Sequence, residues 1–267
     1  MVIGHQIAID STIELNDGVQ MPVFGYGTWQ LAGGKKGVDA LKTALQRGCR
    51  LIDTAQAYGN EALVGQAIQE SGIAREELFI TSKLWSRLTG YDNARNAVHE
   101  SLKAMDLDFI DLYLIHWPKS GANADTWKGL VEMKQQGLCR SIGVSNFSPD
   151  DIREITESSH IIPSVNQVEY HVFKYPRELQ QYCEQLGIQL EAYSPLARAR
   201  GFTDETVQEI ARNHQRMPGQ VMLRWVLQHD AIPIPKSSNP SHIEENAGVF
   251  DFELSEEEMR RLDALSL

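Results

Sequence analysis

The sequence predicts an α/β protein, a (β/α)8 TIM barrel with an N-terminal β-hairpin. Short runs rich in strand formers alternate with longer stretches whose apolar residues recur every three or four positions, as in amphipathic helices. Counting the run near 23–27, there are eight such strands. Strict alternation implies parallel strands joined by right-handed crossovers, and eight of these units close naturally into a barrel. A doubly wound open sheet is the alternative.

The elements follow in chain order. The stretch TIELNDGVQMP alternates like a strand and turns at Asp17 and Gly18, which predicts the hairpin. After the buried strand near Val23 to Gly27, seven strands are predicted in RLIDT, LFITSK, DLYLIHW, SIGVSN, SVNQVEY, IQLEAYS and AIPIPKS. Helices are predicted in VDALKTALQRG, EALVGQAIQESG, ARNAVHESLKAM, TWKGLVEMKQQG, PRELQQYCEQLG and SEEEMRRLDAL, and several end at a glycine suited to a left-handed cap.

The composition indicates one globular domain over residues 1–267. The chain is 42% hydrophobic and 23% charged, and no Ser/Gly/Pro-rich linker divides it. An excess of 36 acidic over 25 basic side chains disfavours nucleic acid or an anionic membrane as the main partner. We find no signal-peptide layout and no apolar run near the roughly 20 residues that span a bilayer. We therefore expect a soluble, cytoplasmic monomer that acts on a small molecule.

Several common cofactor and metal motifs do not match. Gly25 and Gly27 are followed by Gln30 where a dinucleotide-binding fingerprint needs its third glycine. The GGKKG stretch at 33–37 lacks the Ser or Thr of a P-loop and is interpreted as a flexible or helix-leading loop. No HExxH or tight His/Cys cluster predicts a metal site. The cysteines form no CxxC pair and are expected to be buried, reduced thiols: Cys49, Cys139 and Cys183.

Polar side chains stand where the predicted strands end. In such a barrel, functional residues gather at the carboxyl ends of the strands. Any one of these polar side chains, taken alone, could simply contact solvent or form a hydrogen bond to a loop. Together they are expected to face one rim: Asp53, Lys83, His116, Ser145, Asn146, Gln167, Glu169, Tyr193, Ser194, Lys236 and Ser237.

Four titratable groups at this rim form a candidate catalytic set. Asp53, Lys83 and His116 end three consecutive strands, and Tyr58 lies in the loop after the first of them. A buried lysine needs a carboxylate partner, and an ammonium group lowers the pKa of a nearby phenol from about 10. We therefore predict that Asp53 holds Lys83, and that Lys83 lowers the pKa of Tyr58, a general acid. His116 would orient a carbonyl oxygen or share the proton. Because this site has no obvious nucleophile or metal, a cofactor must supply the rest of the chemistry, and hydride is the natural candidate for the group that the cofactor transfers.

Seven ordered segments resemble signature segments of the aldo-keto reductases: GCRLIDTAQAYGNE, ITSKLW, DLYLIHWP, IGVSNF, NQVEYH, AYSPL and IPKSSNPSHIEEN. The resemblance covers essentially the whole chain and extends to the bacterial diketogluconate-reductase-like branch. It implies a barrel whose hairpin crosses the bottom, and NADP(H)-linked reduction of aldehydes and ketones. It also places Asp53, Tyr58, Lys83 and His116 in the catalytic tetrad.

The resemblance further implies a nicotinamide cofactor site. The residues of this site would hold the nicotinamide carboxamide, stack on the nicotinamide ring, or bind the pyrophosphate, the 2′-phosphate and the adenine. They are Thr28, Trp29, Asp53, Ser145, Asn146, Gln167, Tyr193, Ser194, Leu196, Lys236, Ser237, Ser238, Asn239, His242, Glu245 and Asn246. His242 stands where many NADP-preferring members have arginine, whose planar fork and permanent charge it lacks. We expect NADPH as the cofactor because Lys236 is kept, with appreciable use of NADH.

The substrate pocket is expected to be walled by aromatic residues. By resemblance the substrate-binding residues are Trp29, Tyr58, Trp85, His116 and Trp117, although Trp85 could equally fill core space. A short loop after Trp117 and an end at Leu267 suggest an open mouth that accepts small aldehydes, α-dicarbonyls or keto sugars. Two other functions stay open: a non-catalytic nicotinamide-binding protein, and a lyase with Lys83 as a Schiff-base amine.

Overall fold

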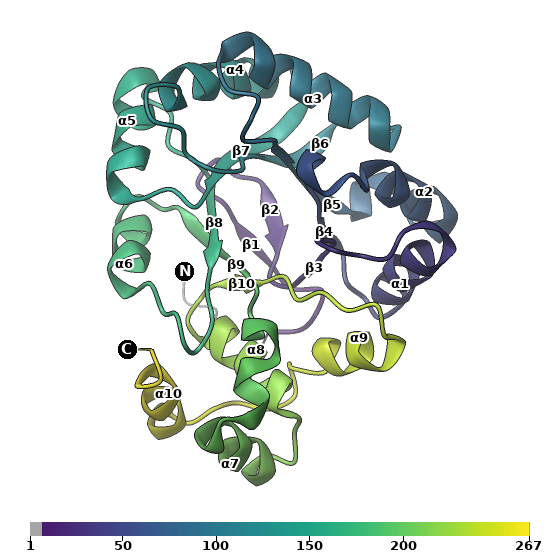
Figure 1. Cartoon of the computed structure of the whole chain (residues 1–267), viewed down its shortest axis with the longest axis vertical. Coiled ribbons are helices and arrows are strands. Elements are labelled where there is room, and N and C mark those ends of the chain that lie inside the picture. Colours follow the sequence, from purple (N-terminus) through teal and green to yellow (C-terminus); the bar gives the residue numbers. More distant parts are fainter. Residues whose placement is uncertain (1–6, 267) are drawn as a thin grey trace.

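The computed structural model describes residues 7–266. Residues 1–6, part of the segment in which we expect no signal peptide, lie outside the described residues, as does Leu267. The described part is built around a ring of strands surrounded by helices (Figure 1). None of its helices is long and apolar enough to cross a membrane.

The ring consists of parallel strands whose spatial order follows their order in the chain. In sequence they are β3 (Gly25–Gly27), β4 (Leu51–Asp53), β5 (Phe79–Leu84), β6 (Ile110–Ile115), β7 (Cys139–Ser145), β8 (Val165–Glu169), β9 (Gln189–Tyr193) and β10 (Ile232–Pro233). The seam between the first and the last is bridged where the Gly27 amide donates to the Pro235 carbonyl at 3.1 Å. A side chain at Gly27 would come within 2.9 Å of the Ile234 carbonyl, so glycine permits this approach. The barrel prediction is confirmed and the open sheet is excluded.

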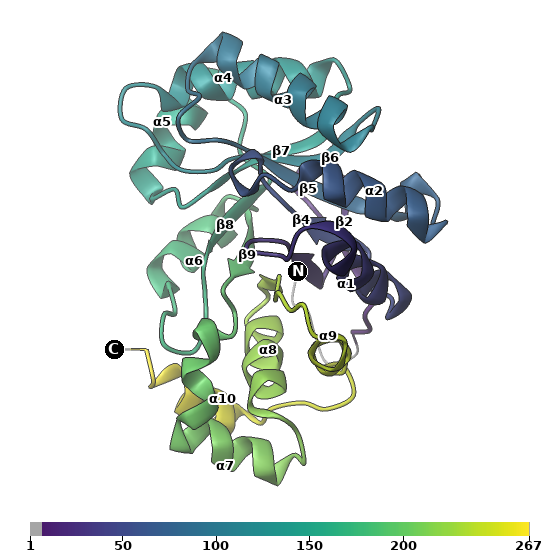
Figure 2. The same cartoon turned by 45° about the vertical axis from the view of Figure 1, so that its right-hand side comes forward.

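Helices pack around the outside of the ring (Figures 1 and 2). They are α1 (Gly34–Gln46), α2 (Glu61–Ser71), α3 (Tyr91–Met105), α4 (Asn123–Gln135), α5 (Pro149–Ser159), α6 (Arg177–Gln185), α7 (Glu205–Asn213), α8 (Pro218–Gln228), α9 (Pro240–Ala247) and α10 (Glu256–Asp263), with short 3-10 turns η1 (Gln56–Tyr58), η2 (Arg75–Glu77) and η3 (Ala197–Thr203). All six predicted helices are present. The GGKKG stretch, predicted as a flexible or helix-leading loop, instead forms the N-cap and first turn of α1, which begins at Gly34. Helices α5, α7, α8 and α9 were not predicted.

The hairpin closes the amino-terminal end of the barrel. Strands β1 (Thr12–Glu14) and β2 (Gln20–Pro22) pair antiparallel, with Ile13 opposite Met21. Their apolar side chains pack with barrel residues near the strand starts, including Leu51 and Phe79. The turn is fastened because the Asp17 carboxylate accepts hydrogen bonds from Lys134 and from Ser141. The end of the barrel formed by the carboxyl ends of the strands is not covered by the hairpin and can hold a functional site.

Side-chain alternation divides each strand between two environments. On β5, Ile80 and Leu84 belong to the core between strands and helices, whereas Phe79 belongs to the barrel interior. Lys83 shares the inward parity of Phe79, so it points into the barrel above the apolar layer. The interior is therefore apolar beside the hairpin and polar at the carboxyl ends.

The three cysteines lie in the packed layers of the fold. All are free and buried. Burial raises the pKa of the Cys49 thiol, and that of Cys183, to about 12. Both groups are therefore neutral thiols at physiological pH, and the prediction that the cysteines are buried is confirmed.

Candidate active site

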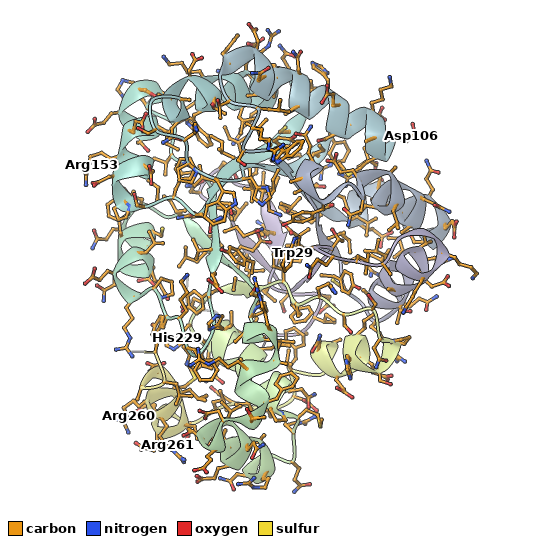
Figure 3. The ribbon with its side chains drawn as sticks, viewed as in Figure 1. Trp29, Asp106, Arg153, His229, Arg260 and Arg261 are labelled. Atoms are coloured by element: carbon orange, nitrogen blue, oxygen red, sulfur yellow. The ribbon has the colours of Figure 1, made fainter. Side chains whose placement is uncertain are left out.

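A cavity of about 530 Å³ opens at the carboxyl ends of the barrel strands. It lies where the ring of strands opens, and Trp29 projects near the centre of the view, whereas Asp106, Arg153, Arg260 and Arg261 lie at the periphery (Figure 3). The sequence-predicted residues that line it are Trp29, Asp53, Tyr58, His116, Trp117, Ser145, Asn146, Gln167, Tyr193, Ser194, Leu196 and Lys236. These come from seven of the barrel strands or the loops that follow them, as expected for this fold.

An ion pair between β4 and β5 forms the floor of the site. Lys83 Nζ lies 2.7 and 2.6 Å from the two carboxylate oxygens of Asp53 and also donates to the Thr54 carbonyl at 2.9 Å. The lysine side chain is 0% exposed. Burial lowers the pKa of Lys83, but the charge and hydrogen bond of Asp53, together with Tyr58 and Glu191, outweigh burial, and the net direction is upward. The ammonium therefore keeps its proton, as a buried cation does only beside a carboxylate.

The Tyr58 phenol sits above this ion pair, on the turn η1 that follows β4. Its hydroxyl is 3.4 Å from Lys83 Nζ, and its ring packs edge-on to the His116 imidazole with centroids 5.7 Å apart. Burial raises the pKa of Tyr58, Lys83 lowers it, and Asp53 and Glu191 raise it further, so that the net direction is upward. The prediction that the pKa of Tyr58 is lowered is therefore wrong. Asp53 neutralises the ammonium, and the contact is longer than an ordinary hydrogen bond, so burial prevails.

His116 follows directly on β6 and faces the same space. Burial and, secondarily, the Lys83 charge lower the pKa of this imidazole to about 3. Its ring is therefore neutral at any working pH, and within the described residues its Nδ1 is buried without a hydrogen-bond partner. A neutral imidazole suits the orienting role that we predicted. It does not suit the alternative of sharing a proton as an imidazolium.

The opposite wall carries hydroxyl and amide groups from β7, β8 and β9. Ser145 Oγ donates to the Gln167 carbonyl at 2.8 Å, and the Tyr193 hydroxyl donates to Asn146 Oδ1 at 2.9 Å. Asn146 and Ser194 have left-handed backbone, with φ of 62° and 52°, a strain that clusters at functional sites. A nicotinamide carboxamide needs both donors and acceptors, and its ring needs an aromatic face. These residues fit that group.

A buried carboxyl group that was not predicted from the sequence lies below this wall. Glu191 is fully buried in β9 and accepts a hydrogen bond from Gln167 Nε2 at 2.6 Å. The same Nε2 donates to Asp53 Oδ2 at 2.8 Å. Glu191 precedes Tyr193 by two residues in IQLEAYS, so strand alternation alone signals that it points inward.

The predicted phosphate and adenine residues lie outward along the next loop. Lys236 lines the cavity, and the loop continues through Ser237 and Ser238 to Asn239, which caps α9 by accepting from the Ser241 amide at 3.1 Å. His242 is exposed in the first turn of that helix. Glu245 and Asn246 follow on α9, beyond the cavity lining. The loop thus runs from the cavity to an exposed helix start that carries the predicted phosphate residues.

Apart from the residues on the loop and helix after Lys236, two predicted cofactor- or substrate-binding residues do not line the cavity. Thr28 is fully buried just after β3. Trp85 lies beyond the end of β5, where the Leu88 amide donates a hydrogen bond to the Trp85 carbonyl and the chain turns. The Arg87 guanidinium lies over the Trp85 ring, 4.9 Å from its centroid. Its backbone turn keeps it on the outer rim.

Among the described lining residues that were not predicted from the sequence, Arg198 is the one with a charged side chain. Arg198 belongs to η3, a segment whose backbone is left-handed at Arg198 and Ala199. Its guanidinium lies over the Trp29 ring at 5.5 Å. The loop after β9 therefore reaches the loop after β3 across the mouth of the cavity.

Comparison with known proteins identifies relatives over the whole fold. Residues 23–267 match the family described as the Aldo/keto reductase family. A glyoxal reductase from Bacillus subtilis is 46% identical over 259 residues, which cover 97% of this chain and 94% of that protein. The crystal structure of an aldo/keto reductase from Brucella melitensis superposes with a TM-score of 0.92 at 40% identity, covering 96% and 99% of the two chains. A Bombyx mori aldo-keto reductase solved in complex with NADP gives 0.90 at 35% identity, covering 97% and 94%.

Proposed function

The chain belongs to the aldo/keto reductase family, and from this premise we propose that it reduces small aldehydes and α-dicarbonyl compounds with Tyr58 as the proton donor. Membership makes it an NAD(P)H-dependent oxidoreductase that reduces carbonyl groups by hydride transfer, and the NADP-bound relative supports NADPH as the cofactor. The substrate class and the catalytic roles are the proposed part.

The observation that carries the proposal is the contact of one buried ammonium with both a carboxylate and a phenol. Lys83 Nζ lies 2.6 Å from Asp53 Oδ2 and 3.4 Å from the Tyr58 hydroxyl. A nicotinamide held at this site would supply the hydride. Tyr58 holds a proton at working pH, since its pKa is above the ordinary value, and donates it to the oxygen on which negative charge develops. Lys83 then stabilises the phenolate that Tyr58 leaves behind.

The other residues position the reactants. The neutral His116 imidazole orients the carbonyl oxygen toward Tyr58. Ser145, Asn146 and Gln167 would hold the carboxamide of the nicotinamide, and Tyr193 would stack on its ring. Because Gln167 directs its Nε2 toward two carboxyls, the group that it offers to the carboxamide is its amide oxygen.

The remaining cofactor assignments lie on the segments that follow β3, β9 and β10. We assign Thr28 and Trp29 to the nicotinamide end, Ser194 and Leu196 to the pyrophosphate, and the positions after β10 to the 2′-phosphate and adenine: Lys236, Ser237, Ser238, Asn239, His242, Glu245 and Asn246. Lys236 favours NADPH. His242 cannot form the bidentate contact of an arginine, so appreciable turnover with NADH is expected.

Small substrates are proposed from the chain's similarity to a glyoxal reductase and from its cavity walls. Trp29 and Trp117 line the cavity while staying 44% and 47% exposed. Their exposure supports an open mouth above the cavity. The diketogluconate-reductase-like branch, with keto sugars as substrates, is the second candidate.

A panel of carbonyl compounds tests the proposal. The purified chain would be mixed with NADPH and with glyoxal, methylglyoxal, simple aldehydes or a keto sugar, and cofactor consumption would be followed by absorbance. We expect the largest kcat/KM with the α-dicarbonyls. Tight NADPH binding without turnover of any compound would instead favour the non-catalytic binding protein. Borohydride trapping of a substrate on Lys83 would favour the lyase.

The overall organisation of the protein completes the proposal. We propose that residues 1–267 act as one catalytic domain, as a cytoplasmic monomer. Gel filtration coupled to light scattering tests the monomer directly, since a mass of 30.0 kDa is expected.

A further inference from the structure

Two carboxyl groups share one amide beneath the active site. Gln167 in β8 lies directly beside Glu191 in β9. Its Nε2 donates to Glu191 Oε2 at 2.6 Å and to Asp53 Oδ2 at 2.8 Å. All three side chains are buried, and the residue next to Glu191 in β10 is the apolar Ile232. The amide therefore connects Glu191 to the carboxylate that holds the catalytic lysine.

The charges around Glu191 do not balance if it ionises. The titratable groups that face it are Asp53 from β4, Lys83 from β5 and Tyr58 from η1. Lys83 is the only cation among these groups, and it donates hydrogen bonds to both carboxylate oxygens of Asp53. Glu191 Oε1, in contrast, is buried without a hydrogen-bond partner among the described residues. Burial and, next, the Asp53 charge raise the pKa of Glu191 to about 8. Most of the Glu191 side chains are therefore protonated and uncharged at neutral pH.

We propose that Glu191 is a positioning residue of the carbonyl reduction, an uncharged carboxyl that orients Asp53 through Gln167 and adds a negative charge beneath Tyr58 only in alkaline solution. This rests on the proposed role of Tyr58 as the proton donor. Glu191 lies beneath the cavity and does not line it. It acts through the hydrogen bonds of Gln167 and through its charge.

Ionisation of Glu191 has a defined consequence for Tyr58. A second negative charge beneath the site disfavours the phenolate, because Glu191 raises the pKa of Tyr58. Glu191→Gln keeps the size and the acceptor for Gln167 but never ionises. The reverse reaction, alcohol oxidation, requires the phenolate. We expect its pH profile to move to lower pH in Glu191→Gln, because this variant never places the second negative charge beneath the phenol.

A stability experiment tests the protonation of Glu191 without any substrate or cofactor. An acid whose pKa is raised in the folded state stabilises the fold below its unfolded pKa near 4.5, and this stability is lost as pH rises through about 8. The Tm of Glu191→Gln minus that of the wild type should therefore rise between pH 5 and pH 8 and then level off. The matched control is Glu157→Gln, on the exposed side of α5, for which the difference should be flat. A flat difference for Glu191→Gln as well would overturn the proposal.

The kinetic arm uses the same variants. We expect Glu191→Gln to bind NADPH within about twofold of the wild type and to show the shifted oxidation profile, with Glu157→Gln unshifted. A uniform loss of activity with an unmoved midpoint would show a merely structural role and refute the inference. If Tyr58→Phe were as active as the wild type, the proposed function would fail instead, and the stability result for Glu191 would still stand.

Discussion

The ion pair of Asp53 and Lys83 should be strongly coupled in stability. Lys83→Met leaves a buried carboxylate without its cation, and Asp53→Asn leaves a buried ammonium without its anion. Their side chains are 3% and 0% exposed, and removal of one member of such a pair costs about 3–5 kcal/mol. For a chain of this size, each kcal/mol corresponds to about 2–4 °C in Tm. We therefore expect each single variant to lose about 6–20 °C.

The double variant decides whether the two charges act on each other. Removing both leaves no unpaired charge, so Asp53→Asn with Lys83→Met should lose less stability than the sum of the singles, by a few kcal/mol. Urea unfolding followed by circular dichroism measures all four proteins.

The matched control is a pair on the surface of α1. Lys35 Nζ lies 3.1 Å from Asp39, but these side chains are 87% and 55% exposed. Lys35→Met and Asp39→Asn should combine almost additively. The reasoning would be refuted if the buried pair also combined additively, within about 0.5 kcal/mol.

Three further outcomes follow from the same structure. Because the pKa of His116 is lowered to about 3, the pH profile of kcat/KM should show no ionisation of this imidazole between pH 5 and 8, and an inflection near 6.5 that disappears in His116→Gln would contradict it. Gly65→Ala should destabilise the fold by about 1–3 kcal/mol in urea unfolding, because its Cβ would lie 2.2 Å from the Met105 carbonyl. Gly33→Ala meets no atom within 4 Å and should be nearly neutral. His242→Arg should raise the preference for NADPH over NADH about tenfold in steady-state assays, the effect of a charge-assisted phosphate contact, and an unchanged ratio would remove His242 from the phosphate site.

The sequence was sufficient to predict which strand ends would meet. Asp53 and Lys83 follow apolar runs with inward parity, and parallel strands bring such ends to one rim. Their contact at 2.6 Å agrees with that prediction. Tyr58 could be included because it lies only five residues beyond Asp53.

Three features of the site depend on tertiary packing and could not be predicted from the sequence. The predicted fall in the pKa of Tyr58 required one cation to outweigh burial, and burial depends on every side chain around the ring. Strand alternation places Glu191 on the same inward face as Tyr193. It does not reveal that Gln167 donates hydrogen bonds to both Glu191 and Asp53. Arg198 lies on an irregular segment with left-handed backbone, for which strand periodicity makes no prediction.

The central claim is that the Tyr58 hydroxyl, held 3.4 Å from the Lys83 ammonium, supplies the proton. Single-turnover oxidation of bound NADPH by methylglyoxal, measured by stopped flow, tests it in Tyr58→Phe. Tyr182→Phe, on helix α6 and away from the cavity lining, is the matched control. We predict a rate about 10²–10⁴-fold lower for Tyr58→Phe, NADPH affinity within about twofold of the wild type, and no change for Tyr182→Phe. A Tyr58→Phe rate equal to that of the wild type would contradict the account.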